Sequence, residues 1–322
     1  MNDATARTSA RGDMSRSSTA TRAASPVAGS RRHRDAGAAV VPFAPGSVMW
    51  ELGGDLRVLL LFTPAAFALQ GVHPVVGKAL ADHSTVWTNP YGRAWRSVAA
   101  TQRWVYGGQQ AYDEARLLRD LHKNIGGTGY NGQRYHALNA EPYAWVWATS
   151  VPVFIQALRA FWAEPVTDEL EERLYAELEN LGRMLGVQER MIPPTLSEFD
   201  TYYNDMLDQL AAGHPAAHDL LALWSSPPGP PLVPDRLWWP LGRLAGRGIM
   251  FLTAAFGPEV LRDLVAEHAG YDWTERRQRR ADRLLETVQR VSPFLPEATR
   301  YLPHVYAIRV AARNRPIGTY AD

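Results

Sequence analysis

The stretch from residue 93 to residue 122 constrains the fold most, because two helical patterns meet there at a pair of glycines. In the first pattern, Arg93, Arg96 and Ser97 stand three and four residues apart, which places them on one face of a helix. Gly107 and Gly108 then interrupt the pattern. The sequence therefore predicts a helix over 93–106 with two cations on the same side.

The second pattern predicts a helix whose apolar face carries a histidine. Small and apolar residues recur at helical spacing from Ala111 through Ala115 and Leu118 to His122. An imidazole in such a position is a haem ligand, a metal ligand or a core histidine bonded to a carbonyl group, and the core role is the commonest. A pair of arginines on a helix is likewise usually solvated, unless a ligand or a buried carboxylate faces it.

Four short motifs stand in a fixed order around these two helices. LQGVHPVVGKALADHS covers Leu69 to Ser84, NPYGRAWRS covers Asn89 to Ser97, RDLHKNIGG covers Arg119 to Gly127, and GQRYHALNAEPYAWVWA covers Gly132 to Ala148. In this order they resemble the MpaB and rubber-oxygenase (latex clearing protein) family, over about residues 45–315. The resemblance implies an all-α, distantly globin-like fold that carries a b-type haem and activates dioxygen.

The resemblance also implies roles for single residues. His122 is similar to the family's histidine that binds the haem iron, and it is the expected metal ligand. Arg93, Arg96 and Ser97 match the family's Arg-x-x-Lys/Arg-Thr pattern on the opposite side of the haem, and they are the expected catalytic residues. Arg93 is also expected to contact the cofactor.

Two positions depart from the family's pattern, and other candidates stand beside them. Ser97 replaces the usual threonine and keeps its hydroxyl group, whereas Trp147 stands where many relatives have a histidine. Trp147 and Tyr135 are expected to contact the haem, and the bulk of Trp147 bears on the shape and activity of the pocket. His73 and His83 are the alternative iron ligands.

Composition excludes several classes of site and partner. The 322 residues contain no cysteine, which rules out disulfides, iron–sulfur clusters, thiolate-ligated haem and cysteine nucleophiles. The formal net charge of +1 gives no electrostatic case for nucleic-acid binding. A hydrophobic fraction of 46% is that of a globular chain with a substantial core, and the 11 tryptophans suit an aromatic core or a planar ligand.

The chain divides into a tail and one large domain. Residues 1–45 are rich in Ser, Thr, Ala and Arg, and we expect a disordered basic tail followed by a helical catalytic domain over 46–322. The Arg31-Arg32 pair resembles a twin-arginine export signal, but the apolar segment after it is short, so we expect a cytoplasmic protein with export as the alternative. The apolar run from Leu56 to Leu69 contains Pro64 and falls short of the roughly 20 residues that cross a bilayer. It predicts a buried helix.

Further along the chain, helix signals alternate with connectors. A second apolar helix is predicted from Glu141 to about Trp162, and a charged helix from the capping residue Thr167 to Leu185. The glycines of segment 126–132 predict turns, and the prolines of segment 225–234 predict a connector. After it, Trp238, Trp239, Leu241 and Leu244 are expected to pack back onto the core.

The expected function is that of a haem b-dependent oxygenase which acts with dioxygen on an apolar, isoprenoid-like or secondary-metabolite substrate. The resemblance implies oxidative cleavage of a carbon–carbon double bond, with hydroxylation as an open variant, and no sequence feature identifies an electron donor. The alternative is a non-catalytic helical protein that binds haem or lipid, with Trp147 closing the oxygen site. A helical scaffold without a cofactor is the third alternative.

Overall fold

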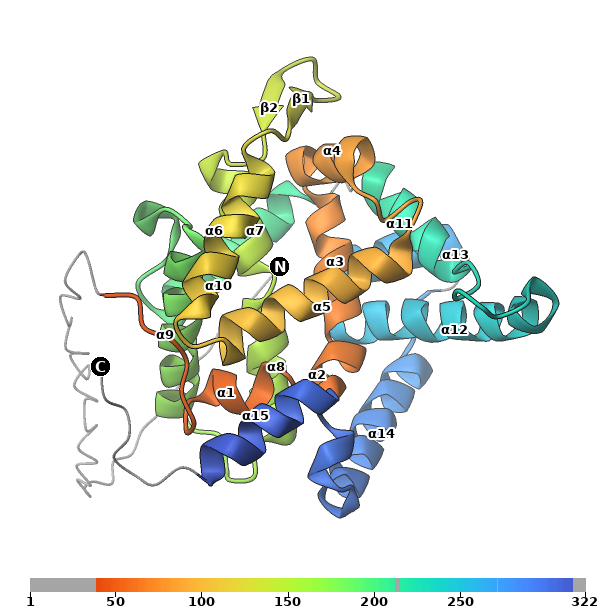
Figure 1. Cartoon of the computed structure of the whole chain (residues 1–322). Coiled ribbons are helices and arrows are strands. Elements are labelled where there is room, and N and C mark those ends of the chain that lie inside the picture. The colour runs from red at the N-terminus through yellow and green to blue at the C-terminus, as the bar shows by residue number, and fades with distance from the viewer. Residues whose placement is uncertain (1–38, 212–214, 271, 315–322) are drawn as a thin grey trace, which may run out of the picture. The chain divides into compact units, whose positions relative to one another are not determined.

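The computed structural model describes residues 39–211, 215–270 and 272–314, and this part of the chain is almost entirely helical (Figure 1). The helices of the first half are α1 (Val48–Leu52), α2 (Leu56–Leu61), α3 (Thr63–Val72), α4 (Pro74–His83), α5 (Pro90–Tyr106), α6 (Gln110–His122), α7 (Ala140–Ala148) and α8 (Val151–Phe161). Between α6 and α7 lies a small antiparallel hairpin of β1 (Gly126–Thr128) and β2 (Arg134–His136). The all-α fold class predicted from the sequence is confirmed.

The second half of the described chain continues the helical pattern. Its α-helices are α9 (Asp168–Leu185), α10 (Leu196–Gln209), α11 (Pro215–Ser225), α12 (Asp235–Phe256), α13 (Glu259–Ala269), α14 (Glu275–Val291) and α15 (Pro303–Arg313). Short 3₁₀ turns are η1 (Glu189–Met191), η2 (Ser292–Phe294) and η3 (Glu297–Thr299). None of the helices in the described ranges is long and apolar enough to span a membrane.

Aromatic side chains form the centre of the core. Trp145 on α7, Tyr175 on α9 and Phe199 on α10 are each at most 1% exposed. The Phe199 ring lies 5.6 Å from the ring of Tyr175 and 5.6 Å from that of Tyr203, measured between centroids. Because buried aromatic rings contribute large apolar areas and favour such tilted or offset contacts, this cluster joins α7, α9 and α10.

Helix ends follow the local chemistry of the sequence. Thr167 caps α9 by accepting a hydrogen bond from the Leu170 backbone N–H, and α9 ends at Gly186, whose φ of 81° is in the left-handed region. A residue with a side chain is strained at such an angle, so glycine suits this position. Both ends of the predicted charged helix are therefore confirmed.

Two predicted single helices are each divided in the structure. The run from Leu56 to Leu69 divides at Phe62, and the helix expected from Glu141 to Trp162 divides at Thr149 and Ser150. In both cases a proline occupies the first turn of the helix that follows. Proline is tolerated there but not within a helix, because it lacks an N–H group and clashes with the preceding turn.

The N-terminal part of α12 differs from its prediction. Trp239, Leu241 and Leu244 are 65%, 55% and 67% exposed, so they do not pack onto the core as expected. Trp238 alone of the four is partly buried, and its indole N–H donates to the Pro227 carbonyl oxygen at 2.8 Å. Figure 1 shows the reason, since the first turns of α12 extend beyond the helices that lie beside its second half.

The expected tail lies only partly within the described residues. Residues 1–38, including the Arg31-Arg32 pair, are outside them. Residues 39–44 lie against the helices, with Phe43 only 6% exposed. The Val41 backbone exchanges two hydrogen bonds with the Asn180 side chain of α9, and the Val40 carbonyl oxygen accepts one from the Tyr112 hydroxyl of α6.

Candidate functional site

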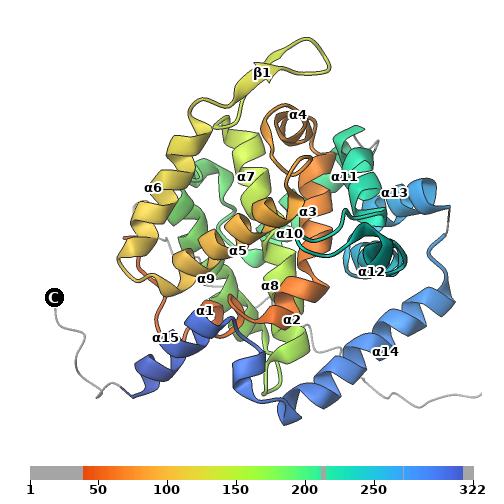
Figure 2. The same ribbon diagram turned by 45° about the vertical axis from the view of Figure 1, so that its right-hand side comes forward.

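The predicted pair of helices forms the frame of the candidate site. α5 and α6 meet at Gly107 and Gly108 and diverge from there, with α7 between their far ends in both views (Figures 1 and 2). Near the junction, Arg103 of α5 donates to Glu114 of α6 at 2.8 Å. The diverging arrangement places the first turns of α5 opposite the last turns of α6.

Apolar side chains are left uncovered where α5 and α6 diverge. Glu114 faces α5, and Leu117 and Leu121 follow it at helical spacing on the same side of α6. Their side chains are 52% and 63% exposed. On α7, Val146 is 39% exposed although its neighbours Trp145 and Trp147 are buried. Uncovered apolar groups of this kind are typical of the walls of a ligand site.

His122 is the last residue of α6 and is half-buried. Its Nδ1–H donates to the Leu118 carbonyl oxygen at 2.7 Å, because a carbonyl oxygen accepts only. The neutral ring therefore keeps an unprotonated Nε2, and no described residue bonds to that atom. The Tyr143 ring of α7 lies edge-on to the imidazole with centroids 6.2 Å apart, and it limits the orientations open to the histidine.

The two alternative ligands, His73 and His83, are engaged differently. His73 is 2% exposed, and its Nδ1 accepts from the backbone N–H groups of Val75 and Val76 while its Nε2–H donates to Glu141 at 3.0 Å. Burial lowers the pKa of His73, and Glu141 opposes this shift. His83 is exposed, and its Nε2 bonds to the Gly126 carbonyl oxygen at 3.1 Å. Only His122 of the three combines partial burial with an unengaged Nε2.

Arg93, Arg96 and Ser97 lie in the first turns of α5. Arg93 donates to the Ser97 hydroxyl oxygen, and Ser97 donates to the Arg93 carbonyl oxygen at 3.2 Å. Arg96 is exposed and donates to the Thr85 hydroxyl at 2.6 Å. Neither arginine pairs with a carboxylate within the described ranges. Burial, and then the charge of Arg96, lowers the pKa of Arg93.

Trp104, which was not among the predicted site residues, lies on the same side of α5 as Ser97. Trp104 follows Ser97 by seven residues, a spacing that returns to the same face of a helix. Its indole Nε1 is buried and has no hydrogen-bond partner among the described residues. A buried donor without a partner costs about 1–3 kcal/mol, so this atom is suited to a bound acceptor. The spacing from Arg93 and Ser97 could have identified it.

The two remaining predicted contacts, Tyr135 and Trp147, lie elsewhere on the frame. The Tyr135 hydroxyl of β2 donates to Asp82 of α4 at 2.9 Å, and burial with this bond raises the pKa of Tyr135 to about 12. Trp147 is 3% exposed and donates to the Leu178 carbonyl oxygen of α9 at 2.8 Å. No described contact joins either side chain to His122 or Arg93.

The predicted cations therefore lie in the first turns of α5 and the predicted histidine at the end of α6, and no described contact joins them directly. One imidazole nitrogen is available to a metal, and two guanidinium groups without carboxylate partners are available to an anion. Clusters of three or more His, Cys, Asp or Glu side chains that suit a metal ion are absent from the described residues. This defines an all-helical protein with a candidate site between α5 and α6.

Comparison with known families identifies the family of the chain. Residues 50–290 match the family model described as "ER-bound oxygenase mpaB/B'/Rubber oxygenase, catalytic domain". The chain belongs to this family, as its motifs predicted. Since the family consists of oxygenase catalytic domains, a general oxygenase role is supported.

Two curated relatives extend the comparison to mycobacteria. The chain is 25% identical over 251 residues to the Uncharacterized protein Rv2237 of Mycobacterium tuberculosis, and equally to the Uncharacterized protein Mb2261 of Mycobacterium bovis. Each alignment covers 77% of this chain and 93% of the relative. No solved structure matched the chain, and the distant likeness to globins stays a prediction.

Proposed function

We propose that this chain is a haem b-dependent oxygenase of an apolar substrate, with His122 as the iron ligand. The observation that carries the proposal is the His122 ring, whose Nδ1–H is held by the Leu118 carbonyl oxygen at 2.7 Å. Haem-ligating histidines usually have their second nitrogen engaged in this way, because the bond fixes the tautomer and the ring orientation.

The other residues of the site fit a haem as well. A haem has apolar faces and two propionates. The frame offers the exposed Leu117 and Leu121, together with Arg93 and Arg96, which pair with no carboxylate among the described residues. Arginine binds carboxylates through parallel N–H groups, so these two residues would hold the propionates or orient a polar group of the reactants. The unpartnered Trp104 N–H is a further donor on this face.

When bound, the haem supplies the iron at which dioxygen is activated. The protein's own contribution is to position and to exclude water. Leu117, Leu121 and Val146 would bury apolar surface of the haem or of the substrate. Ser97, held by Arg93, keeps a hydroxyl group in place and donates its proton to the Arg93 carbonyl oxygen in the resting arrangement. A hydroxyl that turns from this bond donates to a developing negative charge.

Haem loading combined with oxygen consumption tests the proposal. The protein is reconstituted with haem, and oxygen uptake is followed with squalene, an apolar isoprenoid alkene, and with smaller alkenes. We expect a Soret band and substrate-dependent uptake in the wild type, and the loss of both in His122→Ala. His83→Ala is the matched control, because His83 also bonds to a carbonyl oxygen yet is exposed.

The result of haem loading and oxygen uptake distinguishes the oxygenase from its two alternatives. A Soret band without oxygen uptake on any apolar substrate favours the non-catalytic haem-binding protein. The absence of a Soret band after reconstitution contradicts both haem readings. Trp147 does not favour the closed-site alternative, because its indole is used in packing between α7 and α9.

A further inference from the structure

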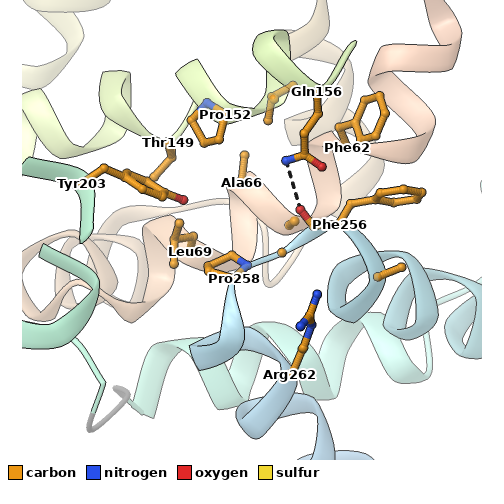
Figure 3. Close-up of a pocket in the computed structure, with 14 residues that line it drawn as sticks. Phe62, Ala66, Leu69, Thr149, Pro152, Gln156, Tyr203, Phe256, Pro258 and Arg262 are labelled. Carbon is orange, nitrogen blue, oxygen red and sulfur yellow. Dashed lines mark hydrogen bonds between the residues drawn. The ribbon is translucent and has the colours of Figure 1, made fainter. Parts of the chain in front are cut away.

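A cavity of about 270 Å³ lies on a different part of the fold (Figure 3). Its lining comes from α3, the α7–α8 junction, α8, α10, the end of α12 and the start of α13. None of the lining residues belongs to α4, α5 or α6. The cavity is therefore distinct from the candidate haem site, and it lies near the small end of the range for ligand pockets, about 300–1,000 Å³.

Most of the cavity wall is apolar. Side chains of Phe62, Ala66 and Leu69 cover one side, and Pro152 and Pro258 face them from other segments (Figure 3). Two of the lining polar side chains are already engaged. Thr149 donates to the Val146 carbonyl oxygen at 2.8 Å and accepts from Gln70, while the Gln156 amide donates to the Phe256 carbonyl oxygen at 3.3 Å.

Among the described residues that line the cavity, Arg262 is the only charged one. Its Nε–H donates to the Ala254 carbonyl oxygen at 3.1 Å, and its guanidinium carbon lies 5.6 Å from the centroid of the Trp273 ring. Among the described residues, no carboxylate pairs with it and no acceptor binds its two terminal nitrogens. Figure 3 shows these nitrogens turned from α13 towards the cavity. A fixed guanidinium with a free edge is the usual receptor for a carboxylate.

Tyr203 adds a second polar group to the cavity. Its ring stacks on that of Trp145 with centroids 5.7 Å apart, and its hydroxyl has no hydrogen-bond partner among the described residues. Burial raises the pKa of Tyr203, so the phenol stays protonated and its O–H is open to an acceptor on a ligand. The cavity thus offers one cation, one neutral donor and apolar walls, and no acidic side chain is present among the described lining residues.

We propose that this cavity binds a short apolar carboxylate, such as a medium-chain fatty acid, with the carboxylate at Arg262 and the chain against Phe62, Ala66 and Leu69. At roughly the 30 Å³ of a water molecule for each non-hydrogen atom, the volume of about 270 Å³ holds about nine such atoms, which suits the carbon chain of a medium-chain acid rather than a long lipid. Burial of the chain supplies affinity, and the guanidinium selects the anion.

Calorimetric titration of the purified protein with octanoate tests this proposal. Octan-1-ol has the same chain without the charge, and acetate has the charge without the chain. We expect octanoate to bind at least about tenfold more tightly than octan-1-ol, because a hydrogen bond to a charged group contributes about that factor. Acetate should not bind measurably.

Variants separate the cavity from the rest of the surface. Arg262→Gln should abolish the preference for octanoate over octan-1-ol, and Arg262→Lys should keep part of it. Ala66→Leu fills the cavity and should weaken both ligands. Arg243→Gln is the matched control, because Arg243 also lies over a tryptophan ring, 4.9 Å from the Trp239 centroid, but outside the cavity.

Two results would overturn the proposal. One is equal affinity for octanoate and octan-1-ol in the wild type. The other is octanoate binding that Ala66→Leu leaves unchanged, provided that far-UV circular dichroism shows a folded variant, since the ligand then sits elsewhere. Titration of His122→Ala should give the wild-type result, so the outcome is independent of haem binding.

Discussion

Two arginine-rich regions of this protein differ in what surrounds their charges. Where α1, α2 and α15 meet, the carboxylate of Asp55 is fully buried and binds Arg57 at 2.6 Å and Arg300 at 2.8 Å. Nearby, Arg309 is 5% exposed and pairs with Glu51 and Glu297. In the first turns of α5, by contrast, Arg93 and Arg96 bind only hydroxyl groups among the described residues.

The comparison shows that arginine stabilises the fold in the first region and is open to a ligand in the second. A buried cation must be paired, and each partner in the α1–α2–α15 region satisfies that need from within the chain. The α5 arginines have no carboxylate partner among the described residues, which is the arrangement expected of a site completed by an anionic ligand. Substitutions should therefore affect folding in the first region and binding in the second.

The largest effect on folding is expected for Asp55→Asn. The variant keeps the size of the side chain but leaves Arg57 and Arg300 without their shared anion. Breaking a buried ion pair by removing one partner costs about 3–5 kcal/mol, measured here as the free energy of unfolding in urea. Asp113→Asn is the control, since Asp113 is 73% exposed and its pair with Arg116 should contribute less than about 1 kcal/mol.

The same carboxylate should give an acid-dependent signature. Burial alone would raise the pKa of Asp55, but the hydrogen bonds and charges of Arg57 and then Arg300 outweigh it and lower the pKa below 3.8. A lowered pKa in the folded state adds stability above the unfolded value, and that stability is lost as the pH falls through the folded value. The difference between wild type and Asp55→Asn should thus shrink below about pH 4. A difference that grows towards acid pH would contradict the assignment.

A medium effect is expected for Trp147→Phe. The variant loses the hydrogen bond to the Leu178 carbonyl oxygen and leaves a small void between α7 and α9. Together these changes should cost about 2 kcal/mol of unfolding free energy. The haem spectrum should stay unchanged, because no described contact joins Trp147 to His122. A shifted Soret band in this variant would instead place the indole in the pocket.

The smallest effect on folding is expected for substitution of the two arginines at the start of α5. The double variant Arg93→Gln/Arg96→Gln removes no ion pair among the described residues, so the haem-free protein should change by less than about 0.5 kcal/mol. Haem affinity should fall about tenfold or more, because charge-assisted bonds to the propionates are lost. Titration with haem measures this. An unchanged haem affinity together with a lowered free energy of unfolding would contradict the proposed difference between the two regions.

Much of the fold was predictable because its signals are local. The α5–α6 pair, the capped α9 and the order of helices around His122 depend on spacing, prolines and caps within a few residues. The hairpin of β1 and β2 was expected as turns, since three-residue strands carry no periodic pattern. The exposure of α12 was mispredicted because an apolar face does not reveal whether a partner covers it.

The site was predictable only in part, for a physical reason. Spacing placed Arg93, Ser97 and His122 on helix faces, but the bond from His122 to Leu118 and the missing partner of Trp104 depend on side-chain geometry. The Asp55–Arg300 pair joins residues 245 positions apart, and nothing in the linear sequence connects them. Whether an arginine of this chain is paired within the fold or open to a ligand therefore depends on contacts between residues that are far apart in the sequence.

The most direct test of the central claim is the spectrum of the haem-reconstituted, dithionite-reduced protein before and after carbon monoxide, with His122→Ala and His83→Ala beside the wild type. We predict a Soret band that carbon monoxide shifts in the wild type and in His83→Ala, which would report a haem iron able to bind a diatomic gas. His122→Ala should lose the band or change it. A wild-type spectrum in His122→Ala, or its loss in His83→Ala alone, would contradict His122 as the ligand.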